Sequence, residues 1–198
     1  NAVRVPAVKQ VKVEVRGLAD ALDGFTIAQL SDIHVGPLVR RSKVEKIVER
    51  VNGLGADLVA ITGDVVDGSV QMLREQTAPL GMLRSLHGTA LVIGNHELYS
   101  GAEEWIDEFR RLGTRVLLNE HMVVQRGLET LVVAGITDHT TGAFLSHLAP
   151  DGRKAVLGAP EGVQQGSCWR TSRGAWRMRR AWASTSCCAG HTWRPARA

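Results

Sequence analysis

Three short apolar runs, each ending in small and polar residues, set the strongest limit on how this chain can fold. They cover residues 25–30, 58–62 and 90–93, and Asp, Asn or His follows closely after each run. A nearly continuous apolar run of this length is typical of a strand covered on both faces of its sheet. Residues 42–51, between the first two runs, carry apolar side chains at helical spacing. The order strand, helix, strand predicts an α/β fold with parallel strands.

Five polar side chains with metal-binding chemistry lie at the ends of these predicted strands. Ligands of α/β sheets bind outside the carboxyl ends of the strands, so we expect the five to meet there. Asp32 and His34 should point the same way, because side chains along a strand repeat every two residues. Carboxylate and imidazole suit zinc, manganese or iron better than magnesium or calcium. The candidates are Asp32, His34, Asp64, Asn95 and His96. Turn caps and surface polar residues are the alternative.

Two such ions about 3.5 to 4 Å apart, bridged by a carboxylate, would bind both oxygens of an in-line displacement at phosphorus. Asp64 is the natural bridge, because it comes from the middle of the three motifs. His96 is the candidate to protonate the leaving oxygen or to stabilise charge on the phosphoryl group.

The three motifs resemble those of a known family. Asp32-Ile33-His34, Gly63-Asp64-Val65-Val66-Asp67 and Gly94-Asn95-His96-Glu97, spaced about thirty residues apart, are similar to the motifs of the calcineurin-like metallophosphoesterases. The surrounding sequence resembles a bacterial subgroup that is often attached to membrane segments. The resemblance implies a four-layer αββα sandwich and a phosphomonoesterase or phosphodiesterase whose nucleophile is a metal-bound hydroxide.

The resemblance also implies a role for each candidate residue. Asp32 and His34 would bind the first of two divalent ions (manganese, iron or zinc), and Asp64 would bridge the pair. Asn95 would bind the second ion, and His96 would assist catalysis. The neighbouring acids, Asp67 and Glu97, fit outer hydrogen-bonding residues or helix caps better than ligands.

The composition changes sharply near residue 161. Residues 161–198 hold seven Arg, one acid, all three cysteines and four of the five tryptophans, a balance of +6 against −2 for residues 1–160. We find no sustained period of 2 or 3.6 after Pro160. We therefore predict a metallophosphoesterase domain over 1–160 and an aberrant tail over 161–198, with the C-terminal part of the fold incomplete or disordered.

The family pattern continues with two later motifs that contain histidine. In this chain the first motif is absent and the second is incomplete. A phrase like Leu-Leu-Ala-His-Gln is absent, and Gly-His-Thr-His is half present as Gly190-His191-Thr192, with Trp193 in the last position. The first phrase can be encoded as CTG CTG GCG CAC CAG. A reading frame that starts one base later then gives Cys-Trp-Arg-Thr-Ser, which is the sequence of residues 168–172. We infer that residues from roughly 161 to 189, and again from 193, are translated out of frame, with the frame restored at Gly190 to Thr192. His191 is then the only late metal ligand, and we expect an impaired activity.

The sequence also predicts further strands and helices, a binding partner and a location. We expect a half-exposed strand over 7–16, helices over 70–86 and 102–112, and strands over 116–118, 121–124 and 130–136. The expected partner is a phosphoester substrate, with no nucleic acid beyond a substrate. The chain begins with Asn1 and has no transmembrane or signal segment, so we expect a fragment or processed product. Its location is then membrane-associated, through a segment before Asn1, or cytoplasmic.

Two other functions remain open at this stage. The chain could be a catalytically inactive metallophosphoesterase-like binding domain or a non-functional fragment, because ligands are missing. The Arg/Trp tail could also bind nucleic acid, since arginine meets phosphate and tryptophan stacks on bases.

The out-of-frame hypothesis predicts the DNA sequence of the gene. Sequencing codons 160–198 should show a coding Leu-Ala-His-Gln phrase in the frame adjacent to Cys168–Ser172. A gene with no such phrase in either adjacent frame would disprove the hypothesis.

Overall fold

The three predicted buried strands form one parallel sheet with a short fourth strand at its edge. The computed structural model describes residues 6–15, 18–160, 166–170 and 177–179. In the first sheet the strand order is β1-β2-β3-β4, and every neighbouring pair is parallel. The strands are β1 (Ile27–Leu30), β2 (Leu58–Ile61), β3 (Thr89–Leu91) and β4 (Arg115–Val116).

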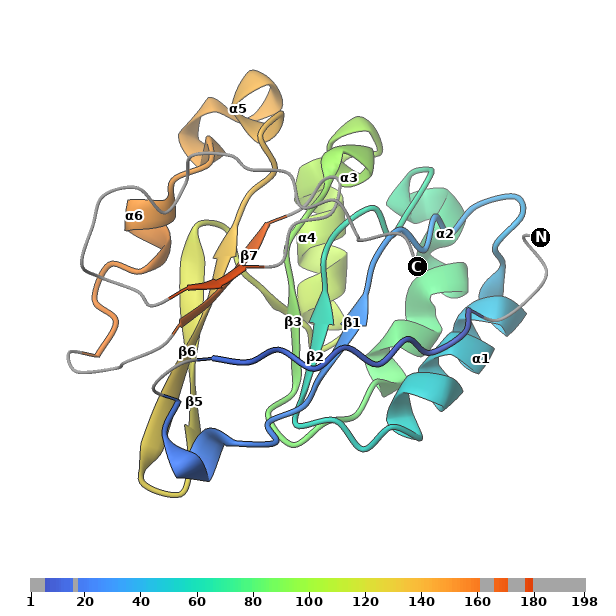
Figure 1. Ribbon diagram of the computed structural model, residues 1–198. Coiled ribbons are helices and arrows are strands. Elements are labelled where there is room, and N and C mark those ends of the chain that lie inside the picture. Colours follow the sequence, from blue (N-terminus) through green and yellow to red (C-terminus); the bar gives the residue numbers. More distant parts are fainter. Residues whose placement is uncertain (1–5, 16–17, 161–165, 171–176, 180–198) are drawn as a thin grey trace, which may run out of the picture.

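Helices connect these strands and cover one face of the sheet (Figure 1). Helix α1 spaces Val44, Ile47, Val48 and Val51 so that all four are buried on one side. Helix α4 buries Trp105, Ile106 and Phe109 in the same way. The elements up to β4 are η1 (Asp20–Leu22), α1 (Arg41–Asn52), α2 (Val70–Thr77), η2 (Ala78–Met82), α3 (Asn95–Tyr99) and α4 (Ala102–Arg111).

A second sheet follows, with the strand order β5-β6-β7-β8. Strands β5 and β6 form an antiparallel hairpin, β7 pairs in parallel with β6, and β8 pairs antiparallel with β7. Short helices lie between β6 and β7. The elements are β5 (Glu120–Arg126), β6 (Glu129–Ile136), α5 (Thr141–Phe144), η3 (Ser146–Leu148), α6 (Gly152–Ala155), β7 (Gly166–Arg170) and β8 (Arg177–Arg179).

The buried apolar side chains form three core clusters, because side chains along each strand alternate between the two faces of its sheet. In β2, Val59 and Ile61 join the cluster under the helices, whereas Leu58 and Ala60 join the cluster between the two sheets. In β6, Leu131 and Val133 pack between the sheets, and Ala134 and Ile136 pack with Ala155 of α6 on the outer face. The order of layers is therefore helix, sheet, sheet, helix, and the predicted α/β class is confirmed.

Gly135 in β6 packs tightly against the first sheet. A Cβ atom there would lie 2.6 Å from Cγ1 of Val92 and still closer to Cβ of Leu117. Such distances are far inside van der Waals contact, so only glycine fits at this position. This contact fixes the spacing between the second sheet and the β3–β4 half of the first.

The strand predicted over 7–16 is wrong, since residues 6–15 contain no strand (Figure 1). The alternating valines lie largely in solvent, with Val11 66% exposed and Val13 52% exposed. Alternation records only which side chains are apolar, whereas a strand also needs a neighbouring strand for its backbone hydrogen bonds.

The helix predicted over 70–86 ends earlier than expected. Helix α2 stops at Thr77, and the 3₁₀ turn η2 carries Pro79 near its start before an irregular stretch to β3. Proline has no N–H to donate and cannot continue an α-helix without a break. The interruption expected at Pro79 is therefore present.

The other predicted elements differ from the structure only at their ends, except after Pro160, whereas α3, α6 and the 3₁₀ turn η1 were not predicted. The sequence predicted no regular structure after Pro160, yet β7 and β8 join the second sheet. Strand pairing satisfies backbone groups of β6, and this pairing does not require an apolar period. The predicted domain boundary at residue 160 stays a prediction, and so does incompleteness of the C-terminal part. None of the helices in the described ranges is long and apolar enough to cross a membrane.

The close approach at Gly135 generates a stability prediction. Gly135→Ala should lower the free energy of unfolding by about 1 to 3 kcal/mol, because the added methyl group overpacks the space between the sheets. Urea unfolding at equilibrium measures this change.

Gly53→Ala is the matched control. Gly53 has a right-handed φ of −67°, and a Cβ there meets nothing closer than 3.5 Å. It should change stability by less than about 1 kcal/mol. Equal effects of the two substitutions would contradict the packing described for Gly135.

Candidate metal centre

The loops that follow β1, β2 and β3 bring three potential metal ligands together. His34, Asp64 and His96 each offer one ligand atom, and these atoms all lie within 4.8 Å of one another. Each of the three side chains is partly buried, at the end of the sheet where the strands finish (Figure 1). Mixed nitrogen and oxygen donors at this spacing fit a transition-metal ion or zinc.

The backbone of this site is left-handed at three of the predicted ligands. Asp32, His34 and Asp64 have φ values of 54°, 51° and 54°. Asp and His tolerate this region better than most residues, although it still costs about 1 to 3 kcal/mol at each position. Hydrogen bonds fix the conformation: the N–H of Asp32 donates to the Gly63 carbonyl, and that of His34 to the Asp64 carbonyl.

We predicted that Asp32 and His34 point the same way because side chains repeat every two residues along a strand, and this explanation is wrong. Strand β1 ends at Leu30, so both residues lie in the following loop and strand alternation does not align them. They are close nonetheless, with Nε2 of His34 lying 3.9 Å from Oδ1 of Asp32. The left-handed turns bring the two side chains together.

Asp67 links the two histidines of the group. Its Oδ1 lies 3.0 Å from Nδ1 of His34 and 2.6 Å from Nδ1 of His96. The two imidazole rings meet edge to face with centroids 4.4 Å apart. When Asp67 is ionised it accepts from both Nδ1–H groups, which leaves Nε2 of each ring to bind a metal ion or to carry a proton.

The charges in this group shift two pKa values in the metal-free protein. Burial lowers the pKa of His34, but the hydrogen bond and charge of Asp67 outweigh burial and raise that pKa above 6.5. Burial raises the pKa of Asp67, but hydrogen bonds from His34 and His96 outweigh it and hold the pKa below its ordinary value. The Asp67 carboxyl is therefore ionised at neutral pH and acts as an acceptor.

Glu97 fastens the loop after β2 to the loop after β3. The residue is fully buried, and its two carboxyl oxygens accept four backbone hydrogen bonds. Oε1 accepts from the N–H groups of Val65 and Val66, and Oε2 from those of Asp64 and Gly94. Burial raises the pKa of Glu97, although the four N–H donors oppose that shift.

Gly94 allows the same two loops to touch. A Cβ atom at Gly94 would lie 2.7 Å from the backbone nitrogen of Asp64 and closer still to its carboxylate. Oδ1 of Asp64 also accepts a hydrogen bond of 3.2 Å from the His96 N–H. The side chain of Asp64 is thus oriented by backbone from the next loop.

Asp32 and Asn95 follow the ends of β1 and β3. The Asp32 side chain is 65% exposed, and Asn95 is partly buried at the start of α3. His191 lies outside the described residues. His96, expected as the catalytic acid, lies with His34 and Asp64 in the ligand group. Asp67 was expected as an outer hydrogen-bonding residue or a helix cap, and it bonds to both histidines. Its two partners were not predicted, because they depend on the distance between loops that are far apart in sequence.

The four hydrogen bonds of Glu97 predict a large effect of a small change. In Glu97→Gln one carboxyl oxygen becomes an NH₂ group, which faces two N–H donors in either orientation. Each donor left without an acceptor costs about 1 to 3 kcal/mol, so the variant should lose at least about 2 kcal/mol of unfolding free energy. Urea unfolding followed by circular dichroism measures this loss.

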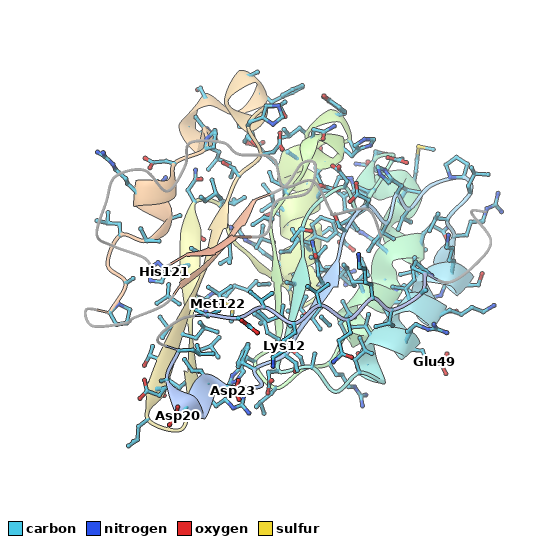
Figure 2. All side chains as sticks on the ribbon, in the orientation of Figure 1. Lys12, Asp20, Asp23, Glu49, His121 and Met122 are labelled. Atoms are coloured by element: carbon cyan, nitrogen blue, oxygen red, sulfur yellow. The ribbon has the colours of Figure 1, made fainter. Side chains whose placement is uncertain are left out.

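Glu49→Gln is the control, because Glu49 lies exposed on the outer side of α1 (Figure 2). Its unfolding free energy should change by less than about 0.5 kcal/mol. If the two variants were equally stable, Glu97 would not be the anchor described here.

Comparison with known proteins gives one consistent result. The model of the calcineurin-like phosphoesterase family matches residues 25–159. A zebrafish protein named transmembrane protein with metallophosphoesterase domain is 39% identical over 142 residues, 70% of this chain and 32% of the relative. The bovine protein of that name is 42% identical over 123 residues, 62% of this chain and 28% of the relative. An uncharacterized metallophosphoesterase of Campylobacter jejuni is 32% identical over 152 residues, 76% of this chain and 38% of the relative.

The chain thus spans about a third of the length of these curated relatives. The matched residues 25–159 include all three strand-end motifs and the whole of the His34, Asp64 and His96 group. Because the family model matches residues 25–159, this chain belongs to the calcineurin-like phosphoesterase family.

Proposed function

We propose that this chain is a metal-dependent phosphoester hydrolase. The observation that carries the proposal is the convergence of His34, Asp64 and His96 from three separate loops, with ligand atoms within 4.8 Å of one another. Asp67 orients both imidazoles from outside the group. A ligand set supported by a second layer of hydrogen bonds is the arrangement that metal sites use.

We propose a dinuclear centre of manganese, iron or zinc. Asp32 and His34 would hold the first ion, Asp64 would serve both ions, Asn95 would bind the second ion and His191 would add a late ligand. The nearness of Asp32 to His34 and the clustering of Asp64 with His34 support the first half of this assignment. When bound, the ions supply Lewis acidity and lower the pKa of water.

We propose that His96 acts as a proton donor and not as a metal ligand, with Nε2 carrying the proton because Nδ1 is bonded to Asp67. In hydrolysis a water oxygen bonds to phosphorus, the bond from phosphorus to the leaving oxygen breaks, and the leaving oxygen takes up a proton. The imidazole of His96 is partly exposed, and its Nδ1 is held by Asp67 at 2.6 Å. Asp67 thereby fixes the ring and balances the positive charge of an imidazolium.

Two further proposals concern the substrate and the location of the protein. The zebrafish and bovine relatives are named transmembrane proteins, and this supports membrane association of the protein to which this chain corresponds. We propose a phosphomonoester or phosphodiester as substrate, since two-metal hydrolysis is indifferent to much of the leaving group.

An inactive binding domain or non-functional fragment is the second candidate. One sequence observation favours it: Trp193 stands where the family pattern has its last histidine. The family match also ends at residue 159, just before the proposed out-of-frame tail.

Removal of the proposed bridge should abolish both metal binding and turnover. Asp64→Asn keeps a side chain that tolerates the left-handed backbone, so the fold should remain. Affinity for Mn²⁺ or Zn²⁺ should fall by more than about 100-fold, because loss of an outer-layer partner alone costs about 10- to 100-fold. Calorimetric titration, with hydrolysis of nitrophenyl phosphodiester and monoester, measures both effects.

Asp23→Asn is the matched control, because Asp23 lies beside η1, away from the strand ends that carry the site (Figure 2). It should leave both readouts unchanged. A parent chain that binds none of manganese, iron or zinc and hydrolyses neither ester would overturn the proposal and support the inactive candidate.

A further inference from the structure

Two aromatic side chains extend a row of rings outward from the metal group. The His34 and His96 rings meet edge to face, and the Tyr99 ring lies 6.1 Å from that of His96. The Phe144 ring then meets Tyr99 edge to face with centroids 5.5 Å apart. The row thus runs from the proposed ligands to residues that no part of the mechanism above uses.

Both outer rings are largely in solvent. Tyr99 is 62% exposed and Phe144 is 52% exposed, whereas the neighbouring α3 residues Glu97 and Leu98 are buried. Single exposed apolar residues are common, but here two large rings from different elements meet beside a polar group. Adjacent apolar surface and convergent polar groups are the usual make-up of a small-molecule site.

The segment that carries Phe144 is held in place on both sides. The buried Asn119 donates from Nδ2 to the Ala149 carbonyl and accepts at Oδ1 from the N–H groups of Thr137 and Asp151. The Thr137 hydroxyl donates to the Leu148 carbonyl. Helices α3 and α5 also contact each other. The backbone on either side of Phe144 is thus held in place, which reduces the loop ordering required when a ligand binds.

We propose that Tyr99 and Phe144 form a subsite that binds an aromatic ring in the leaving group of the phosphoester substrate. This inference rests on the proposed function and names a substrate class for it. Tyr99 lies next to His96, the proposed proton donor to the leaving oxygen, so the rings face the leaving-group side. Edge-to-face and offset stacking favour an aromatic over an aliphatic ligand of equal size.

A binding experiment on the full chain tests this without turnover. Tyr99 is the only tyrosine in the chain, so ring-¹³C tyrosine labelling gives signals from Tyr99 alone. The labelled protein with Zn²⁺ is titrated with benzylphosphonate and with cyclohexylmethylphosphonate, which are similar in size and are not hydrolysed. Benzylphosphonate should shift the Tyr99 signals by its ring current and bind about 2- to 12-fold more tightly.

Variants separate the ring from the rest of the side chain. Phe144→Leu should remove the preference for the benzyl compound, and so should Tyr99→Leu, whereas Tyr99→Phe should keep it. KM ratios for benzyl and cyclohexylmethyl phosphates give the same comparison in catalysis. Phe25→Leu is the matched control, because Phe25 stacks on His87 and precedes β1, away from its carboxyl end.

The outcomes distinguish this proposal from the one on which it depends. Equal affinity for the two phosphonates, or saturation with no shift of the Tyr99 signals, overturns the aromatic subsite and leaves the hydrolase proposal standing. Failure of both phosphonates to bind the zinc-loaded chain overturns both. Loss of the preference in Phe25→Leu would also overturn the subsite.

Discussion

The carboxylate of Glu97 is the interaction on which the site depends. It is fully buried and accepts four backbone N–H groups, three from the turn after β2 and one from Gly94. A turn with several N–H groups pointing inward would otherwise bury unsatisfied donors, each of which destabilises the fold. One side chain therefore satisfies this turn and ties it to the strand end that carries His96. Asp64 and His96 keep their separation for this reason.

The strained backbone of the site follows from the same arrangement. Asp32, His34 and Asp64 all have positive φ, a conformation that costs free energy and that a free loop would relax. Here the loops after β1 and β2 run side by side with backbone hydrogen bonds from Asp32, His34 and Val35 to residues 63–65. Glu97 holds the second of these loops from the other side. These hydrogen bonds between loops at the carboxyl ends of the strands thus hold the strained backbone in place.

The sequence predicted most of the strands and helices and the candidate ligands, but it did not predict the contacts between loops that position those ligands. The apolar runs of β1 to β3 are local signals, and residues such as Leu58 and Ile61 are buried because the sheet is covered on both faces. Residues 6–15 show the limit, because alternation does not specify a pairing partner. Asp67 between His34 and His96, and Tyr99 against Phe144, depend on distances between separate loops. Such contacts follow only from the assembled fold.

The position of the ligand group within the chain bears on whether a damaged tail matters. His34, Asp64 and His96 all follow strands of the first sheet, and their supports Asp67, Gly94 and Glu97 lie within the same stretch of sequence. The second sheet packs against the back of the first through Gly135 and supplies none of these six residues. An out-of-frame tail would remove late ligands without disturbing this group. Assembly of the His34, Asp64 and His96 group and completion of the proposed two-metal centre therefore depend on different parts of the chain.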